Sequence, residues 1–266
     1  MSTPLTLSPL ALSVVVTRLR AAGCVFAEDE AELLVEAAAT SAALDAMVAR
    51  RVVGLPLEHV LGWAEFCGRR VAVHPGVFVP RRRTEFLAAQ AITVARADSV
   101  VVDLCCGSGA VGAALVAALP GVTLYAVDIE PAAVECARRN IGGAGHVYAG
   151  DLYGPLPARL RGRVDVLVAN APYVPTDAID LLPPEARDHE PRVALDGGVD
   201  GLDVQRRVTA NAADWLAPGG CLLIETSERQ AGRTATAFAD AGLVPRIENC
   251  AELDATVVAG TRPART

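Results

Sequence analysis

The feature that most constrains the fold is an alternation, between residues 99 and 260, of short apolar runs with helical patterns. Strands are indicated by the runs SVVVDLC, VTLYAVDI, HVYAG, VDVLVAN and GCLLIET, the first of them buried, and helical spacing recurs between most of them. Such an alternation predicts a mostly parallel sheet with helices on both faces, that is, an α/β fold. Ligands of these sheets bind beyond the carboxyl ends of the strands, so the residues that directly follow each strand form the candidate site.

The first 83 residues follow a different pattern, which predicts two smaller units before the main domain. Apolar residues recur at helical spacing from residue 8 to residue 50, with Gly23 as a stop between two helices. Two runs follow, AEFCGRRVAV and GVFVP, and they predict a strand pair joined through His74-Pro75-Gly76. We therefore expect a helical domain over residues 1–60, a β-hairpin connector over 61–83 and the main domain over 84–266.

Composition and residue spacing exclude several classes of protein. The formal charge of −7 argues against a protein that coats duplex DNA, because phosphate binding needs a basic face. The seven cysteines form no C-x-x-C pair and the four histidines lack metal-ligand spacing, so we expect free thiols and no metal. The chain lacks a charged leader with an apolar core and any window of about 18 uninterrupted apolar residues, which predicts a cytoplasmic protein without a membrane span.

A glycine-rich segment, Asp103 to Gly112, follows the first strand of the main domain. From Gly107 onward it matches G-x-G-x-x-G, a pattern that lets a nucleotide cofactor approach backbone amides at the start of a helix. Asp128 ends the second strand about 20 residues further on, where a carboxylate accepts hydrogen bonds from two ribose hydroxyls. The alternative for Asp128 is a plain helix N-cap before Pro131. The cofactor contacts predicted in this region are Asp103, Cys105, Gly107, Ser108, Gly109, Asp128 and Ile129.

Two further acids bear on the identity of that cofactor. Asp103 stands just before the glycine turn, where an anion would repel the pyrophosphate of NAD but attract the cationic ammonium and sulfonium of S-adenosylmethionine. The alternative is that Asp103 merely caps backbone amides of the turn. Asp151 follows the third strand and is placed to reach the exocyclic amine of adenine, with Leu152 packing on the ring. The alternative for Asp151 is an exposed turn residue.

The segment Asn170-Ala171-Pro172-Tyr173 ends the fourth strand with an amide, a proline and an aromatic ring. A planar NH2 group attacks a methyl group poorly because its lone pair is delocalised. An oxygen on Asn170 and the backbone carbonyl of Ala171 would accept its two N–H bonds and aim the nitrogen at the methyl group. Pro172 would stiffen the turn, and Tyr173 would offer an apolar wall to a flat group. The alternative is a common Asn-Ala-Pro turn with a packed tyrosine.

Asn170-Ala171-Pro172-Tyr173 resembles the Asn-Pro-Pro-Tyr motif of amino methyltransferases, and almost all of the chain is similar to the protein-(glutamine-N5) methyltransferases that modify peptide chain release factors. The other segments that carry this resemblance are EHVLGWAEFCGRRVAV, VFVPRRRTEFL, DHEPRVALDGGVDGLDVQRRV and LAPGGCLLIETSERQ. The resemblance implies a Rossmann-like class I methyltransferase sheet of seven strands, mostly parallel with the last strand antiparallel. It also implies a small N-terminal helical domain that helps to grip the release factor.

The activity implied by the resemblance is N5-methylation of the glutamine in a Gly-Gly-Gln loop of a release factor, with S-adenosylmethionine as donor and S-adenosylhomocysteine as product. The sequence departs from the family pattern at three places. Ala171 replaces a proline, Cys105 replaces the first glycine of the cofactor loop, and Arg82 and Arg83 replace a proline and a glutamate. The three-arginine run from Arg81 either meets an acidic or RNA-bound partner or forms a solvated face.

Three alternatives to a glutamine methyltransferase stay open at this point. An adenine-N6 nucleic-acid methyltransferase would use the same amide, proline and ring, but the acidic balance and the lack of a base-reading domain count against it. An NAD-dependent dehydrogenase would leave Asp103 and Asn170 unexplained. A relative that binds the cofactor without turnover would account for Ala171 and Cys105.

Overall fold

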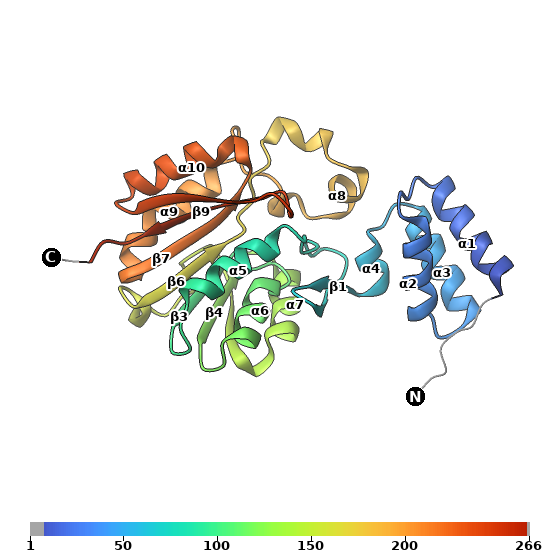
Figure 1. The fold of residues 1–266 in the computed structure, drawn as a ribbon, viewed down its shortest axis with the longest axis horizontal. Coiled ribbons are helices and arrows are strands. Elements are labelled where there is room, and N and C mark those ends of the chain that lie inside the picture. Colours follow the sequence, from blue (N-terminus) through green and yellow to red (C-terminus); the bar gives the residue numbers. More distant parts are fainter. Residues whose placement is uncertain (1–7, 265–266) are drawn as a thin grey trace.

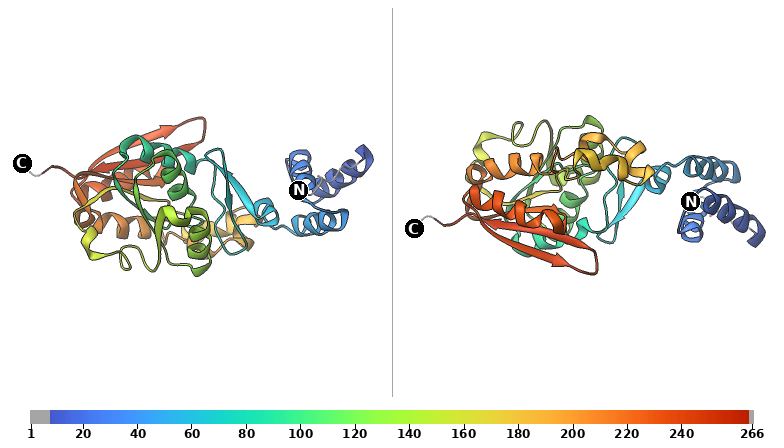
Figure 2. Two further views of the ribbon diagram at one scale, coloured as in Figure 1. Left: turned by 90° about the horizontal axis from the view of Figure 1, so that it is seen from below. Right: turned by 90° about the horizontal axis from the view of Figure 1, so that it is seen from above.

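A computed structural model of the chain describes residues 8–264. Its N-terminal part is a three-helix bundle of α1 (Pro9–Ala21), α2 (Ala27–Ala37) and α3 (Ser41–Val52). The bundle has its own core, in which Leu19, Leu34 and Val48 are fully buried. Figure 1 and Figure 2 show that the bundle stands apart from the sheet and reaches it through the short helix α4 (Leu57–Leu61) and a β-hairpin.

The hairpin consists of β1 (Trp63–Phe66) and β2 (Arg69–Ala72), which pair in antiparallel register. Its turn is Cys67-Gly68, and both residues have positive φ, 49° and 68°. Two successive residues of positive φ suit a two-residue hairpin turn, because such a turn matches the twist of the strands. The prediction of a strand pair joined through His74-Pro75-Gly76 was therefore wrong, since the strands end before this segment and residues 77–79 form no strand.

The main part is a seven-stranded sheet in the order β5-β4-β3-β6-β7-β9-β8. This confirms the seven-stranded, mostly parallel sheet that the family resemblance implied. Its strands are β3 (Val100–Leu104), β4 (Thr123–Asp128), β5 (Gly145–Ala149), β6 (Val164–Ala169), β7 (Leu216–Thr226), β8 (Val244–Cys250) and β9 (Ala255–Thr261). The helices that cover it are α5 (Thr84–Val94), α6 (Ala110–Ala118), α7 (Pro131–Ile141), α9 (Asp203–Trp215) and α10 (Glu228–Asp240). The last strand, β9, is antiparallel to both of its neighbours, β7 and β8.

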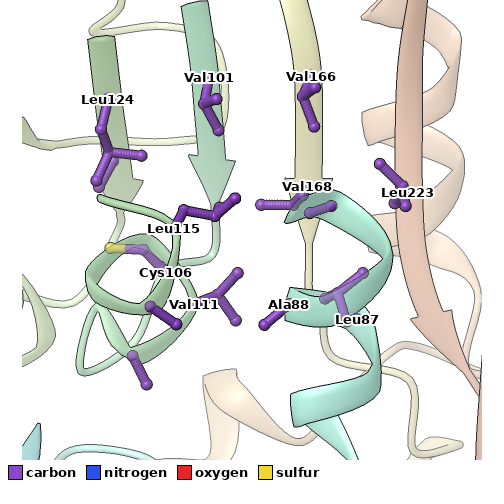
Figure 3. Close-up of a cluster of buried hydrophobic side chains, with 14 of the residues drawn as sticks. Leu87, Ala88, Val101, Cys106, Val111, Leu115, Leu124, Val166, Val168 and Leu223 are labelled. Atoms are coloured by element: carbon purple, nitrogen blue, oxygen red, sulfur yellow. The ribbon is translucent and has the colours of Figure 1, made fainter. Parts of the chain in front are cut away.

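Alternate residues of the central strands face opposite layers of helices, as the period of two in a β-strand requires. Val101, Val168 and Leu223 belong to the core beneath α5 and α6, which Figure 3 shows from the side. Their sequence neighbours Leu222 and Ala169 belong to the opposite core, under α9 and α10. The same alternation applies one step further along each strand. The residue two positions after each of Val101, Val168 and Leu223 therefore lies on the face of the sheet that α5 and α6 cover.

A long segment between β6 and β7 carries the short helix α8 (Pro184–His189) and returns the chain toward the N-terminal bundle (Figure 1). Arg51 of α3 is 5% exposed and donates hydrogen bonds to the largely buried Glu30 of α2 and to Glu185 of α8. This ion-pair cluster joins the bundle to the segment that follows β6. Within residues 8–264, no helix has the length and apolar character that a bilayer crossing demands.

Candidate functional site

A cavity of about 740 Å³ lies at the carboxyl ends of β3, β4 and β6. One part of its wall is the glycine-rich segment after β3, and another is the Asn170–Tyr173 segment after β6. The predicted residues that line it are Asp103, Cys105, Gly107, Ser108, Asp128, Ile129, Asp151, Leu152, Asn170, Ala171, Pro172 and Tyr173. Gly109 is the exception. A Cβ atom there would lie 3.0 Å from Ala137, so this glycine serves the packing of α6 against α7.

Asp103 is 2% exposed, and its Oδ2 accepts a hydrogen bond of 3.0 Å from the backbone N–H of Gly112 in α6. It therefore caps a helix amide, as the alternative interpretation held, and also lines the cavity. Burial and the nearby Asp128 raise the pKa of Asp103 to about 7, against the opposing effect of the Gly112 hydrogen bond. No arginine or histidine within residues 8–264 forms an ion pair with either acid. A cationic ligand would offset this uncompensated negative charge.

Asp128 holds the glycine turn in place. Its Oδ2 accepts a 2.8 Å hydrogen bond from the N–H of Gly107, and its Oδ1 accepts one of 2.9 Å from Glu130. Burial raises the pKa of Asp128, and the two backbone hydrogen bonds oppose that increase. Gly107 has a φ of 55°, and a Cβ atom there would meet nothing within 4 Å. The backbone beside Gly107 is therefore open to the close approach of a ligand.

Cys105, which stands in place of a family glycine, has a φ of 55°. Residues with side chains disfavour this left-handed conformation, so the turn keeps the backbone shape of a glycine at the expense of strain. Burial raises the pKa of the Cys105 thiol, and so do the charges of Asp128 and Asp103. A thiol of this kind is a poor nucleophile, which agrees with a packing role for Cys105.

Asp151 and Leu152 lie just after β5, the third strand of the main sheet along the chain, but their environments differ. The side chain of Asp151 is 52% exposed and forms an ion pair with Arg207 of α9. Leu152 is 9% exposed and has a φ of 46°. Both line the cavity. The exposed-turn alternative for Asp151 is therefore only partly right, because its carboxylate is also held by a cation at the cavity rim.

Asn170 is oriented by α5. Its Nδ2 donates a hydrogen bond of 3.2 Å to the hydroxyl of Thr84, the first residue of that helix and 3% exposed. The Oδ1 of Asn170 and the carbonyl of the buried Ala171 accept no hydrogen bond from any described residue. Both residues line the cavity, and neither of these two acceptors is used by another described residue.

Tyr173 is held from two sides. Its hydroxyl lies 3.4 Å from Oε1 of Glu225, the penultimate residue of β7 and 2% exposed. Its carbonyl accepts a 2.9 Å hydrogen bond from Nε2 of Gln230 in α10. Burial and the charge of Glu225 raise the pKa of Tyr173 to about 12. Tyr173 is therefore a neutral, fixed wall rather than a base.

A glycine-rich loop after α8 supports the Asn170–Tyr173 segment from behind. A Cβ atom on Gly197 would lie 2.7 Å from the carbonyl of Pro172, and one on Gly201 would collide with the carbonyl of Tyr173. The N–H of Gly197 also donates a 2.8 Å hydrogen bond to the carbonyl of Val174. Only residues without side chains allow this backbone-to-backbone packing.

The three-arginine run also belongs to the cavity wall. Arg81 donates a 2.6 Å hydrogen bond to the buried Glu190, and Nε of Arg83 lies 3.7 Å from Oε1 of the buried Glu225. The interpretation of the run as a solvated face is therefore wrong for Arg81, whereas the side chain of Arg83 is 46% exposed and still faces solvent. Arg82 lines the cavity in the same segment.

Sequence reasoning missed Thr84, Glu225 and Gln230 as parts of the site. All three lie within segments that carry the family resemblance, but none follows a strand in an obvious motif. A usable signal was Glu225 itself, because a carboxylate directly after the apolar run CLLI is unusual in a buried strand. Within residues 8–264, no group of three His, Cys, Asp or Glu side chains has the geometry of a metal site, and the expectation of a metal-free site stays a prediction.

Comparison with known proteins agrees with these features. The family model described as "Methyltransferase small domain" matches residues 68–181. A release factor glutamine methyltransferase of Mycolicibacterium smegmatis is 42% identical over 76% of this chain and 72% of the relative. One of Geobacter sulfurreducens is 39% identical over 76% of this chain and 71% of the relative.

A further relative is named for a different activity. A 4-amino-L-phenylalanine/4-methylamino-L-phenylalanine methyltransferase of Streptomyces pristinaespiralis is 36% identical over 73% of this chain and 69% of the relative. Among solved structures, a methyltransferase from Pyrococcus furiosus aligns with a TM-score of 0.56 and 16% identity, covering 74% of this chain and 90% of that chain. This structural likeness supports the Rossmann-like methyltransferase fold.

Proposed function

The chain belongs to the release factor glutamine methyltransferase family, and we propose that it methylates the side-chain amide nitrogen of a glutamine in a release factor or a related protein. The observation that carries this proposal is the pair of free acceptors, Oδ1 of Asn170 and the carbonyl of Ala171, at the cavity edge. Two adjacent acceptors suit a group that carries two N–H bonds on one planar nitrogen. Family membership also decides against an NAD-dependent dehydrogenase.

The donor side of the cavity fits S-adenosylmethionine, which supplies a methyl group on a positively charged sulfur. Asp103 and Asp128 present carboxylates that lack a cationic side-chain partner among the described residues. Gly107 leaves its backbone open to a ligand. We assign the ribose hydroxyls to Asp128, and we assign the adenine ring to the region of Ile129, Asp151 and Leu152.

On the acceptor side, Asn170 and Ala171 would hold the two N–H bonds of the glutamine amide and aim its nitrogen at the methyl group. Tyr173 would form a wall for the flat amide, and Pro172 would limit the movement of the turn. The nitrogen becomes acidic only as its new bond forms. The proton therefore leaves late, and the site needs no strong base and no metal.

We further propose that residues 1–60 form a helical domain that helps to grip the protein substrate, beside a connector over 61–83 and a methyltransferase domain over 84–266; of these ranges, residues 1–7 and 265–266 lie outside the described residues. Support comes from the ion pair between Arg51 of the bundle and Glu185, because Glu185 also lines the cavity. A protein that docks on the bundle would therefore lie next to the cavity. A release factor substrate would place the reaction in the cytoplasm.

A small aromatic amine is the second candidate acceptor. It is favoured by the similarity to the 4-amino-L-phenylalanine methyltransferase. An arylamine, like an amide, has a planar NH2 group with a delocalised lone pair, so the same two acceptors would serve it. An exocyclic adenine amine shares this chemistry, but the charge of −7 disfavours binding to a nucleic acid.

The test is incubation of the protein with methyl-labelled S-adenosylmethionine and a release factor, followed by mass spectrometry of the Gly-Gly-Gln peptide. We expect one methyl group on the glutamine side chain and none on a release factor in which that glutamine is replaced by asparagine. Parallel reactions contain 4-amino-L-phenylalanine or single-stranded DNA. If only 4-amino-L-phenylalanine or only the DNA acquires the methyl label, that acceptor replaces glutamine as the proposed substrate. Cofactor binding without methylation of any acceptor would indicate a relative without turnover.

A further inference from the structure

The buried carboxylate of Glu225 lies next to the proposed acceptor site but outside the cavity wall. Ala169 of β6 pairs with Ile224 of β7 in parallel register, so the residues that follow, Asn170 and Glu225, lie side by side. Both lie two positions after residues of the core under α5 and α6, Val168 and Leu223. Asn170 and Glu225 therefore face the helix layer to which α5 belongs, and Thr84 is the first residue of α5.

The hydrogen bonds around Glu225 are incomplete. Oε1 receives the hydroxyl of Tyr173 at 3.4 Å and lies 3.7 Å from Nε of Arg83. Oε2 is buried and has no hydrogen-bond partner among the described residues. The hydroxyl of Thr84 accepts from Asn170 and interacts with Glu225 strongly enough to lower the pKa of that carboxyl. Burial raises the pKa of Glu225, while the neighbouring Thr84, Arg83 and Tyr173 oppose that increase.

We propose that Glu225 is a positioning residue that fixes which atom of the Asn170 amide faces the acceptor nitrogen, by taking the hydroxyl proton of Thr84 on Oε2. An ionised carboxylate has only acceptor atoms, so the Thr84 hydroxyl must donate to it. The hydroxyl oxygen then has only lone pairs left for Asn170, and these require the Nδ2 side of the amide. The Oδ1 of Asn170 is consequently turned toward the cavity.

This chain of hydrogen bonds fixes the orientation of the Asn170 carboxamide, which an isolated asparagine side chain would leave undetermined. The two ends of a carboxamide have nearly the same shape, so packing alone does not distinguish them. With Nδ2 toward the cavity, Asn170 would present hydrogen atoms to the N–H bonds of the substrate. Glu225 excludes that orientation, because an ionised carboxylate has no hydrogen to donate and therefore must accept the hydroxyl proton of Thr84.

The inference rests on the proposed methylation of a planar amide, so its test includes a measurement that does not depend on activity. The variants are Glu225→Gln, which keeps the shape but adds a donor, Thr84→Val, which removes the hydroxyl, and Thr84→Ser, which restores it. In the protein with its Asn170 side chain labelled with ¹⁵N, we expect the Nδ2 protons to shift and exchange faster in Glu225→Gln and Thr84→Val. Thr84→Ser should return both properties toward those of the wild type. Identical amide signals in all variants would overturn the proposal.

Single-turnover methyl transfer to the release factor supplies the second measurement. Glu225→Gln and Thr84→Val should each lower the rate about tenfold or more at saturating substrate, with cofactor affinity unchanged by calorimetry. On an Asn170→Ala background the same changes should alter the rate less than about twofold, because their effect passes through Asn170. An equal loss on both backgrounds would show a merely structural role and overturn the inference. A wild-type enzyme that methylates no glutamine would instead overturn the proposed function, and the amide signals would still decide the role of Glu225.

Discussion

The two halves of the cavity are built in different ways. On the donor side, the acids accept hydrogen bonds from backbone amides of one stretch of the chain, Asp103 from Gly112 and Asp128, at the end of the neighbouring strand, from Gly107. On the acceptor side, the groups that hold Asn170 and Tyr173 are side chains from distant parts of the chain, namely Thr84, Glu225 and Gln230. The donor half is thus held through backbone amides of the β3–β4 region, and the acceptor half through side chains of three distant elements.

This difference suggests how each half should respond to substitution. A change in the donor half should act on cofactor binding, because its hydrogen bonds shape the turn that surrounds the ligand. A change in the acceptor half should act on methyl transfer and leave cofactor affinity intact, because its contacts orient a second substrate. Substitutions in each half therefore test whether cofactor binding and methyl transfer are separable.

The largest effect is expected for Asn170→Ala. The substitution removes one of two acceptors for the amide nitrogen, so methyl transfer should fall by roughly a hundredfold or more. The affinity for S-adenosylmethionine, measured by calorimetry, should stay within about twofold of wild type, because the donor half is untouched. An equal loss of rate and affinity would mean that the two halves are not separable at Asn170.

Gly201→Ala tests the support of the acceptor half. Its Cβ atom would collide with the carbonyl of Tyr173, and Gly201 also has a φ of 76°. Gly219→Ala is the matched control, because Gly219 has a φ of 82° but open space around its Cβ atom. Both variants should lose about 1 kcal/mol to backbone strain, and Gly201→Ala about 2 kcal/mol more to the collision, as measured by urea unfolding. Equal losses in the two variants would remove the proposed close packing behind Tyr173.

Asp128→Ala tests the donor half. It should weaken cofactor binding about tenfold or more, since this carboxylate holds the N–H of Gly107 and is the one we propose for the ribose hydroxyls. The rate of methyl transfer at saturating cofactor should change far less. Asp151→Ala is the comparison, because Asp151 is half exposed and should have a smaller effect on affinity. Unchanged affinity in Asp128→Ala would remove Asp128 from the cofactor site.

Cofactor binding should depend on pH through Asp103. Its pKa is raised to about 7 by burial and by Asp128, so much of the carboxyl is protonated in the free protein near pH 6.5. A cationic ligand lowers that pKa. The bound state therefore holds fewer protons than the free state, so binding releases protons and strengthens as the pH rises through about 7. Calorimetry in two buffers of different ionisation enthalpy measures this release, which should be absent in Asp103→Asn. Release of the same size in that variant would point to another group.

Cys105→Gly should have the smallest effect. The substitution relieves the strain of a φ of 55°. It also removes the packing of the cysteine side chain and raises the conformational entropy of the unfolded chain. The gain from relieved strain and the two losses nearly cancel, so the free energy of unfolding should change by less than about 1 kcal/mol. Cofactor affinity should be kept or improved. A large loss of affinity would mean that the thiol itself contacts the ligand.

The same contrast explains how much the sequence predicted. The order and type of the central elements and the glycine turn were predicted, and the predicted residues after the strands line the cavity apart from Gly109, because each depends on local pattern. The hairpin turn was misplaced, since two residues of positive φ at Cys67-Gly68 look ordinary in sequence. Thr84 and Glu225 were missed because their positions follow from the pairing of β6 with β7 and the docking of α5. No local motif records either contact.

The most direct test of the central claim is a crystal structure of the protein with S-adenosylhomocysteine and a peptide that contains Gly-Gly-Gln. We predict that the amide nitrogen of the glutamine lies within hydrogen-bond distance of both Oδ1 of Asn170 and the carbonyl of Ala171, and that it points toward the sulfur. A glutamine amide bound away from these two oxygens, or an Asn170 whose Nδ2 faces the peptide, would contradict the account.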